Sequence, residues 1–495
     1  MSRADQPEGT RTRKATRSAT ASGAFAWSLA NTLVSRLGTL GIGIVLARIL
    51  GPEEFGTFAI ALVALMAVLS FNELGVSLAI VRWPGDPALI APTVNTISVI
   101  TSVIFCALGW IIAPSFATMM GDTAATWAIR VLILSVLVNG IVAAPAALLQ
   151  REFAERTRMG IDQVNVWVGA ISSVLLALVG FGAMALAIGR LLGSVISAVM
   201  FLKASPLPYK FGWHKRTAVA LLKFGMPLAG ASIIVFAIGS ADQLVTGAML
   251  GTVALGFYVL AFNLSSWPLS ILSQPLRRVA PATFAAIQHD PVGLRRFVIS
   301  LFSIIACLTI PAFIALAVAA KPLVHFIYGT AWGQAAPVLS WLVIAALSKV
   351  FCELTYDYIV VIGRTSVILR IQIIGLLVLI PSLIAGAHFG GLVGVAVAQA
   401  AVAFIVMLPL YLWNLRSLGI TIASLGARVW LPALAGLGLG AVGWSIVQLI
   451  DTALLGLLAV GVLCLITMAG LIYVRRLELA SLRGIIRPKV LEETS

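Results

Sequence analysis

The chain has 495 residues, of which 60% are hydrophobic and 10% are charged. A soluble globular protein has about 25% charged residues, so this composition excludes a water-exposed surface over most of the chain and predicts a protein embedded in a membrane. The net charge of +15 is spread over many short segments rather than gathered in one patch or arm. This distribution argues against nucleic acid as a partner and favours membrane lipids, because scattered Lys and Arg orient membrane proteins and attract anionic lipid.

Fourteen apolar runs follow a polar N-terminal segment. Residues 1–22 have too few apolar residues to fold, and we expect a disordered cytoplasmic tail, with an organellar transit peptide as the alternative. Each later run has about 20 residues, the length a helix needs to cross the hydrocarbon core. The runs are continuous rather than alternating, which favours helices over a β-barrel. We therefore predict an all-α polytopic membrane protein with spans over 23–47, 56–80, 93–114, 127–149, 160–181, 183–202, 227–249, 256–279, 297–319, 337–361, 367–387, 391–413, 429–449 and 453–474.

The positive residues orient these spans. All but six of the 33 Lys and Arg residues lie in the two tails or in alternate segments between the runs. Because cytoplasmic segments collect Lys and Arg, we expect these segments to be cytoplasmic. An even number of spans then places both termini in the cytoplasm. The six exceptions are Arg36, Arg48, Arg130, Arg190, Lys321 and Lys349.

A short motif is repeated at an offset of 200 residues. Leu50-Gly51, Gly56 and the aromatic Phe58 follow the first run, and Leu250-Gly251, Gly256 and Tyr258 follow the seventh. Coincidence in a chain rich in Gly and Leu is the alternative to duplication. Duplication predicts two parallel six-helix lobes, a known plan of transporters: an N-lobe over 23–202, a cytoplasmic linker over 203–226, a C-lobe over 227–413, two additional spans within 414–474 and a cytoplasmic tail over 475–495.

The stretch Leu46-Ala47-Arg48-Ile49-Leu50-Gly51-Pro52-Glu53-Glu54-Phe55-Gly56 resembles the first-loop signature of the polysaccharide biosynthesis, or oligosaccharide flippase, family. This family belongs to the multidrug/oligosaccharidyl-lipid/polysaccharide exporter superfamily. Trp27 with Arg36, the segment 144–151 and Asp242 with Gly247 resemble the same family. The span count is most similar to the exporters of exopolysaccharide and teichuronic-acid type. Intramembrane cations differ widely among these proteins, so the roles of single residues do not transfer.

This resemblance implies a transporter rather than an enzyme. A member would move an undecaprenyl-diphosphate-linked glycan across the bacterial cytoplasmic (inner) membrane, with two lobes rocking about a cationic central cavity. It would act as a monomer, beside the polysaccharide polymerase and the glycosyltransferases of its pathway. Three alternatives stay open: a cation-coupled multidrug antiporter, a peptidoglycan-precursor lipid flippase and a membrane glycosyltransferase. The last would need large extramembrane loops, which the spacing of the runs does not provide.

Charged residues inside the spans are the candidate site, because a charge at the bilayer centre costs at least about 2.5–3.5 kcal/mol. Arg36 lies at the middle of the first span on a stripe with Thr32 and Thr39, and its guanidinium could bind a diphosphate with paired hydrogen bonds. A structural ion pair with Asp242 is the alternative. Arg190 is a second cavity candidate, although Gly189 and Gly193 around it also predict close packing of another helix.

Three carboxylates are candidates for a coupling ion, H⁺ or Na⁺: Asp242 beside Gln243, and Glu353 and Asp357 on one predicted face with Lys349. Lys349 is a substrate-contact candidate and is also spaced for an ion pair with Glu353. Arg278, next to Arg277 at the inner end of the eighth span, could meet the headgroup, or it could be an ordinary cytoplasmic charge. Three tryptophans could stack on sugars or anchor the chain at the membrane interface: Trp267, Trp332 and Trp341.

The sequence has no phosphate-binding motif of the GxxxxGK[ST] type. Its four cysteines lie singly in apolar runs and its four histidines are scattered. We therefore expect no metal site and no cofactor.

Overall fold

The computed structural model describes residues 9–72, 75–286, 290–450 and 452–476, with side chains described outside 9–40, 269–283, 285–286, 291 and 422. Helices make up almost all of this part of the chain. The first half contains α1 (Gly9–Asn72), α2 (Val76–Arg82), α3 (Ala91–Met119), α4 (Ala125–Arg151), α5 (Glu155–Leu178) and α6 (Ala183–Ala204). The second half contains α7 (Lys215–Leu250), α8 (Thr252–Ala286), α9 (Pro291–Val318), α10 (Ala320–Tyr328), α11 (Ala335–Val361), α12 (Thr365–Ala401), α13 (Leu408–Trp413), α14 (Ile422–Leu449) and α15 (Ala453–Val474).

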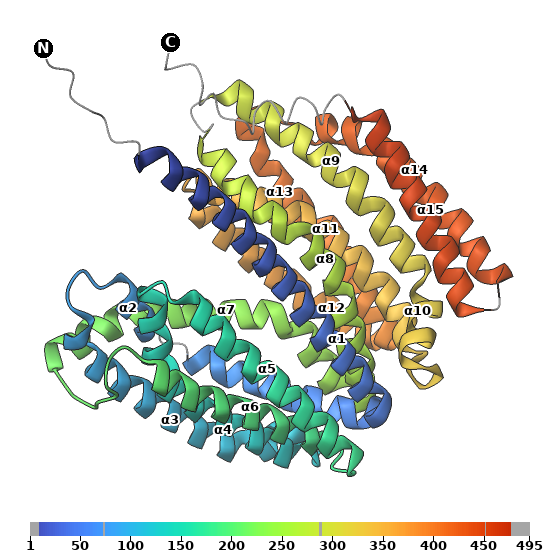
Figure 1. The fold of residues 1–495 in the computed structure, drawn as a ribbon. Coiled ribbons are helices and arrows are strands. Elements are labelled where there is room, and N and C mark those ends of the chain that lie inside the picture. The colour runs from blue at the N-terminus through green and yellow to red at the C-terminus, as the bar shows by residue number, and fades with distance from the viewer. Residues whose placement is uncertain (1–8, 73–74, 287–289, 451, 477–495) are drawn as a thin grey trace, which may run out of the picture.

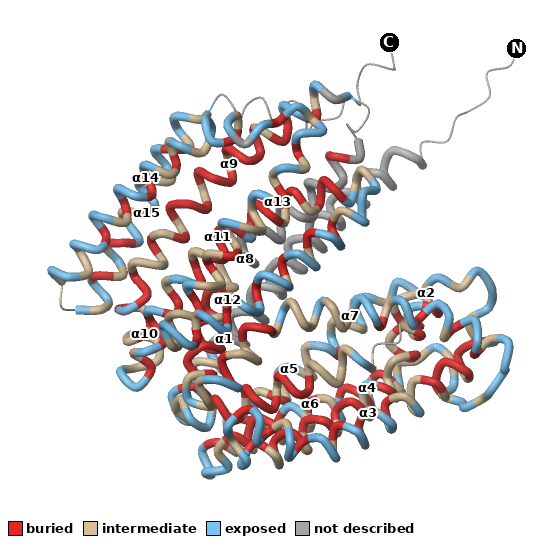
Figure 2. The backbone as a smooth tube through the Cα atoms, turned by 180° about the vertical axis from the view of Figure 1, so that it is seen from behind, coloured by how far each residue is buried: buried red, intermediate tan, exposed pale blue. Residues whose placement is uncertain are grey.

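The helices form two groups that meet at one end and separate toward the other. Figure 1 shows α2–α6 on one side and α8–α15 on the other, with α1 and α7 running between them, and Figure 2 shows the same arrangement from behind. Helix α1 begins, and α15 ends, on the side where the two groups separate. We call α1–α6 the N-lobe and α7–α13 the C-lobe. The predicted all-α architecture is therefore confirmed.

Kinks explain how the fourteen predicted spans appear in the structure. Eleven helical segments of the described part are long and apolar enough to cross a membrane. The first two predicted spans are the two halves of α1, separated at Gly51, whose φ of 72° is accessible mainly to glycine. The eleventh and twelfth are separated in the same way at Gly391, where φ is 55°. The eighth corresponds to α8, of which part of the side chains lie outside the described residues.

One predicted boundary is wrong. The second span does not reach residue 80: α1 ends at Asn72, and the short α2 begins after Gly75. Helix α7 begins at Lys215, within the predicted cytoplasmic linker 203–226, and includes Pro227. The remaining linker residues are held by α3, where Asn95 Nδ2 donates to Lys210 O at 2.9 Å and Thr96 Oγ1 donates to Gly212 O at 2.9 Å.

Small residues bring helices close together where the sequence predicted it. A side chain at Gly189 or Gly193 of α6 would overlap the backbone of α5 at Gly169 and Asn165, so the predicted close packing is confirmed. The two added helices pack elsewhere. Helix α14 contacts α9 through Gly436, where a Cβ atom would lie 2.6 Å from Ile310 Cγ2. Helices α14 and α15 therefore cover the side of the C-lobe formed by α9 and do not come between the helices of either lobe.

Candidate functional site

The two copies of the repeated motif contact each other where the lobes meet. A Cβ atom at Gly56 would overlap the carbonyl oxygen of Thr252, and a Cβ atom at Gly256 would overlap the carbonyl oxygen of Pro52. Position 252 is 52 plus the repeat offset of 200, and 256 is 56 plus the same offset. The contact is therefore repeated about an approximate twofold axis between α1 and α8. We call the contacts of residues 47–57 with residues 251–257 and 326–332 the junction.

Trp332 fills the centre of the junction. Its side chain is 1% exposed, and its ring lies edge-on to Phe55 of the N-lobe at 5.5 Å and to Phe257 of the C-lobe at 5.8 Å between ring centroids. Its Nε1 donates to Ala47 O at 3.2 Å. The interpretation of Trp332 as an interfacial anchor or sugar platform is wrong, because the side chain is enclosed by both lobes and meets neither lipid nor an open cavity.

Charged groups of the motif hold the junction, through Arg48, and the N-lobe beside it, through Glu54. Arg48 donates from Nε to Ile327 O at 2.6 Å and from Nη2 to Phe326 O at 2.7 Å. These carbonyl groups belong to the last turn of α10, where a cation is favourable because the helix leaves its final carbonyls without partners. Glu54 Oε2 accepts from Ala183 N at 2.6 Å at the start of α6. Arg48 is one of the six positive residues outside the predicted cytoplasmic segments, and its contact between the lobes explains its position.

A polar cavity of about 530 Å³ lies within the C-lobe, lined by residues of α7, α8, α11, α12 and α13 and of the π-helical segment Val402–Met407. Lys349 of α11 and Val235 and Gly239 of α7 are exposed at its edge. Asp242 and Glu353 add two carboxylates to its lining. The charged residues therefore lie on the α7 and α11 walls, and the opposite wall from α12 and α13 carries neutral polar groups.

Asp242 is held in place by the C-lobe itself. Its carboxylate is 2% exposed and accepts hydrogen bonds from Tyr258 Oη at 2.9 Å and from Gln243 N at 2.8 Å. Lys349 of α11 lines the same cavity as this carboxylate. A buried charge needs such partners, since an unpaired one would carry a large desolvation penalty. The hydroxyl group of Tyr258 is a partner that the sequence analysis missed.

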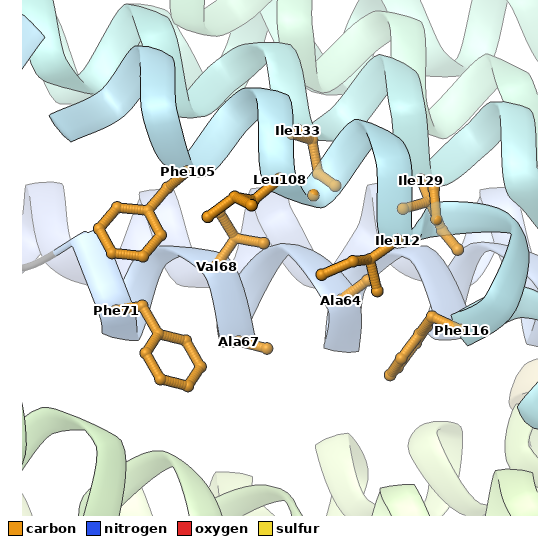
Figure 3. A pocket seen from close by; sticks show the side chains of 12 residues that line it. Ala64, Ala67, Val68, Phe71, Phe105, Leu108, Ile112, Phe116, Ile129 and Ile133 are labelled. Carbon is orange, nitrogen blue, oxygen red and sulfur yellow. The ribbon is translucent and has the colours of Figure 1, made fainter. Parts of the chain in front are cut away.

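The N-lobe contains a pocket of different chemistry. Its volume is about 300 Å³, and side chains of α1, α3 and α4 line it with carbon atoms alone. Figure 3 shows Phe71 and Phe105 together at one end and Phe116 at the other; the rings of Phe71 and Phe105 stack at 6.3 Å. The two lobes share an architecture, but within the described residues the charged cavity lies in the C-lobe and the N-lobe pocket is apolar.

Comparison with known proteins identifies the family. Residues 45–337 match the model of the polysaccharide biosynthesis protein family. The chain belongs to this family. The resemblance read from the motif around Arg48 is confirmed, and the match begins at this motif, next to Leu46, and continues to the loop that carries Trp332.

Several relatives of this polysaccharide biosynthesis protein cover most of its length. Lipopolysaccharide biosynthesis protein WzxC of Escherichia coli (strain K12) is 24% identical over 84% of this chain and 85% of its own. Succinoglycan biosynthesis transport protein ExoT of Rhizobium meliloti (strain 1021) is 25% identical over 68% of this chain and 69% of its own. Teichuronic acid biosynthesis protein TuaB of Bacillus subtilis (strain 168) is 21% identical over 63% and 65%.

Solved structures have the same fold. The lipid II flippase MurJ in an inward closed conformation has a TM-score of 0.74 at 14% identity and covers 92% of this chain and 99% of its own. An inward-facing multidrug resistance MATE family transporter of the MOP superfamily has a TM-score of 0.60 at 17% identity, covering 78% of this chain and 95% of its own. At these identities the likeness establishes the fold of a multi-pass membrane protein and nothing finer.

Of the seven charged residues that the sequence analysis selected as candidate site residues, three lie together in the structure. Asp242, Lys349 and Glu353 line the C-lobe cavity. Asp357 is buried and does not line it, because eight residues of helix rotate a side chain by about 80° from its starting face. Arg190 is exposed on α6 of the N-lobe and lines neither pocket. The side chains of Arg36 and Arg278 lie outside the described residues.

The predicted ion pair between Lys349 and Glu353 is wrong. Among the described residues, the structure records no contact within 4.0 Å between their charged atoms, although it does record one between Arg158 and Glu155. Spacing along one helix permits an ion pair but does not require it, because such pairs are worth only about 0.2–0.5 kcal/mol. Lys349 is exposed at the edge of the cavity that Asp242 also lines.

Proposed function

We propose that this protein is a flippase that moves undecaprenyl-diphosphate-linked oligosaccharide from the inner to the outer leaflet of the bacterial cytoplasmic membrane. Membership of the polysaccharide biosynthesis protein family supports this proposal, as do relatives named for lipopolysaccharide, succinoglycan and teichuronic acid biosynthesis. The observation that carries it is the junction: α1 and α8 of the two repeated lobes touch at this end, and the helix groups separate toward the other end, where the first half of α7 packs against α2 and α3. Two repeated lobes that meet in this way suit alternating access. The protein would not be an enzyme.

Transport would proceed by opening the junction. With both termini in the cytoplasm, the lobes separate toward the cytoplasm and the junction closes the outer end. In the reverse state, Gly56 and Gly256 would move away from the opposite backbone, and Trp332 would leave one of its two aromatic neighbours. Closely packed interfaces switch between discrete arrangements rather than deforming continuously, so this contact suits a two-state transporter.

The diphosphate of the substrate needs cations inside the membrane, because an unpaired charge there is costly. Lys349 meets this requirement at the edge of the C-lobe cavity, where its side chain is exposed. Arg36, Arg190 and Arg278 would add positive charge along the path between the lobes. The carboxylates of Asp242, Glu353 and Asp357 are proposed to bind the coupling ion, H⁺ or Na⁺. Asp242 is the strongest candidate because it is buried and lines the same cavity as Lys349.

The test is leaflet transfer of a fluorescent undecaprenyl-diphosphate sugar in proteoliposomes, followed by chemical quenching of the outer leaflet. Wild type should transfer the lipid, Lys349→Ala should slow transfer about tenfold, and Lys349→Arg should keep most of the rate because it keeps the charge. The loss of one charge-assisted hydrogen bond sets this magnitude. Failure of the folded wild-type protein to transfer any lipid-linked sugar, with or without an ion gradient, would refute the flippase.

A cation-coupled multidrug antiporter is the second candidate, because the fold matches a multidrug transporter and the apolar N-lobe pocket with its phenylalanines could take an aromatic cation. Such a protein would export dyes from cells in a manner that depends on an ion gradient. Dye export without lipid transfer would favour this alternative. A flippase of peptidoglycan precursors would instead transfer lipids carrying N-acetylmuramyl peptides in the same vesicles.

A further inference from the structure

The neutral wall of the C-lobe cavity is not used by the proposed contacts with diphosphate or coupling ion. Gln372 and Gln399 of α12 and Tyr411 of α13 form this wall. Gln372 Nε2 donates to Tyr411 Oη at 3.4 Å. A side-chain amide offers both donors and acceptors, and a phenol hydroxyl offers one donor and an acceptor. Three neutral groups of this kind on one wall are suited to a neutral polar ligand.

Gln399 has a polar atom that a ligand in the cavity would satisfy. Its Oε1 is buried and, within the part of the chain that the structure describes, accepts no hydrogen bond. Buried polar atoms in native proteins nearly always have a partner, and this residue lines a cavity that can hold one. A ligand that presents a hydrogen-bond donor at this position would supply the partner that Gln399 Oε1 lacks.

The backbone beside Gln399 is shaped around the cavity. Residues Val402–Met407 form a π-helical segment, a rare conformation that frequently occurs at functional sites. Ser348 Oγ of α11 donates to Ala403 O at 2.8 Å and holds this turn. On the other side Gly375 leaves room for Met407, whose Cε would lie 3.1 Å from a Cβ atom there. The π-helical segment, Gly375 and Met407 line the same cavity as Gln372 and Gln399.

A sugar ring fits these features better than an ion. The cavity volume of about 530 Å³ lies within the range of about 300–1,000 Å³ typical of small-molecule pockets and exceeds the needs of one coordinated cation. Sugar hydroxyls donate and accept, as the wall requires, and the C–H faces of a sugar can pack on Phe262 and Leu376, which also line the cavity. Lys349 at the edge would then lie on the side where the diphosphate enters.

We propose that the C-lobe cavity binds one neutral sugar of the lipid-linked glycan through Gln372, Gln399 and Tyr411, and that this wall selects which glycan is moved. The proposal rests on the proposed function, because it assumes a glycan substrate. It assigns recognition of the sugar to α12 and α13 and recognition of the charge to α7 and α11.

The test is calorimetric titration of the purified full-length protein in detergent with three ligands: undecaprenyl diphosphate, the same lipid carrying galactose and the same lipid carrying glucose. The variants are Gln399→Leu and Tyr411→Phe. Gln163→Leu is a matched control, because Gln163 Oε1 on α5 is also buried without a partner among the described residues but does not line the cavity.

Wild type should bind one sugar-bearing lipid at least tenfold more tightly than the sugar-free lipid. Each of Gln399→Leu and Tyr411→Phe should remove about five- to tenfold of that difference, the worth of one hydrogen bond, and leave the sugar-free affinity unchanged. Gln163→Leu should change neither affinity. Because Tyr411→Phe removes a single hydroxyl group, it decides the matter if Gln399→Leu does not fold.

Equal affinity of wild type for all three lipids would overturn the sugar site, as would an equal loss for the sugar-bearing and sugar-free lipids in both variants. The proposed function has its own readout in leaflet transfer. Transfer of lipid-linked sugars without sugar-dependent binding would keep the flippase and discard the sugar site. Sugar-dependent binding that is lost in Tyr411→Phe, with no transfer, would keep the site and discard the flippase.

Discussion

Substituting Gly56 by alanine should open the junction. A Cβ atom at Gly56 would lie 2.8 Å from the carbonyl carbon of Thr252 and 3.0 Å from its Cγ2. The backbone of α8 cannot turn away as a flexible side chain could, so α1 and α8 must separate. Overpacking of this kind costs about 1–3 kcal/mol. Because only the closed junction carries this cost, about 2 kcal/mol would shift the balance between closed and open junction about 30-fold toward the open state.

The assay is the distance between spin labels at two exposed positions of the repeated motif, Glu53→Cys and Val253→Cys, measured by electron paramagnetic resonance in nanodiscs. The four native cysteines are buried, which limits labelling elsewhere. Wild type should give mainly the short distance of the closed junction, and Gly56→Ala should add a longer one. Gly438→Ala on α14 is the matched control, because a Cβ atom there meets nothing within 4 Å. Identical distance distributions in wild type and Gly56→Ala would refute the role of this contact in closing the junction.

Other substitutions test the junction and the cavity. Trp332→Phe should lower the free energy of unfolding by about 1 kcal/mol through loss of the hydrogen bond to Ala47, and Trp332→Ala by about 3–5 kcal/mol, as measured by thermal denaturation in detergent. An unchanged free energy of unfolding in Trp332→Phe would contradict the role of the hydrogen bond. Arg48→Ala should cost only about 1 kcal/mol, because Arg48 is exposed, but should lengthen the distance between spin labels on the two lobes, whereas Arg48→Lys should do so less. Asp242→Asn should remove the dependence of lipid transfer on an ion gradient while preserving the fold; an unchanged dependence would exclude Asp242 as the coupling group.

The strength of each signal in the sequence decided how much of the site could be predicted. Lys349, Glu353 and Asp242 stood out because a charge within an apolar run is rare and costly. Gln372, Gln399 and Tyr411 were missed because neutral polar residues in such runs are common, and only the packing of α12 and α13 places them on one wall. The π-helical turn at residues 402–407 has no signature in the sequence and depends on neighbours such as Ser348.

The errors have physical reasons of the same kind. Trp332 was assigned to a surface because tryptophans between spans usually mark the membrane interface. Its burial depends on a contact between the lobes with Ala47, which is 285 residues away in the chain. The helices themselves were predictable from apolar length. Gly51 and Gly391 join neighbouring spans without an intervening loop. The ends of these spans are therefore not marked in the sequence, although the number of spans follows from the number of apolar runs.

Because the contacts in the junction are crossed, residues in each half of the chain constrain which residues the other half can carry. Gly56 depends on the backbone at Thr252, and Gly256 depends on the backbone at Pro52. An enlarged residue in one half can be tolerated only if the other half retreats, so compensating changes must arise at the partner position and not beside the first change. Duplication of an ancestral half, which the repeated motif predicts, would leave most of each half free to diverge, as in the apolar N-lobe pocket and the polar C-lobe cavity. We therefore expect positions 52–56 and 252–256 to covary across homologues, as the part of the two halves that had to evolve together.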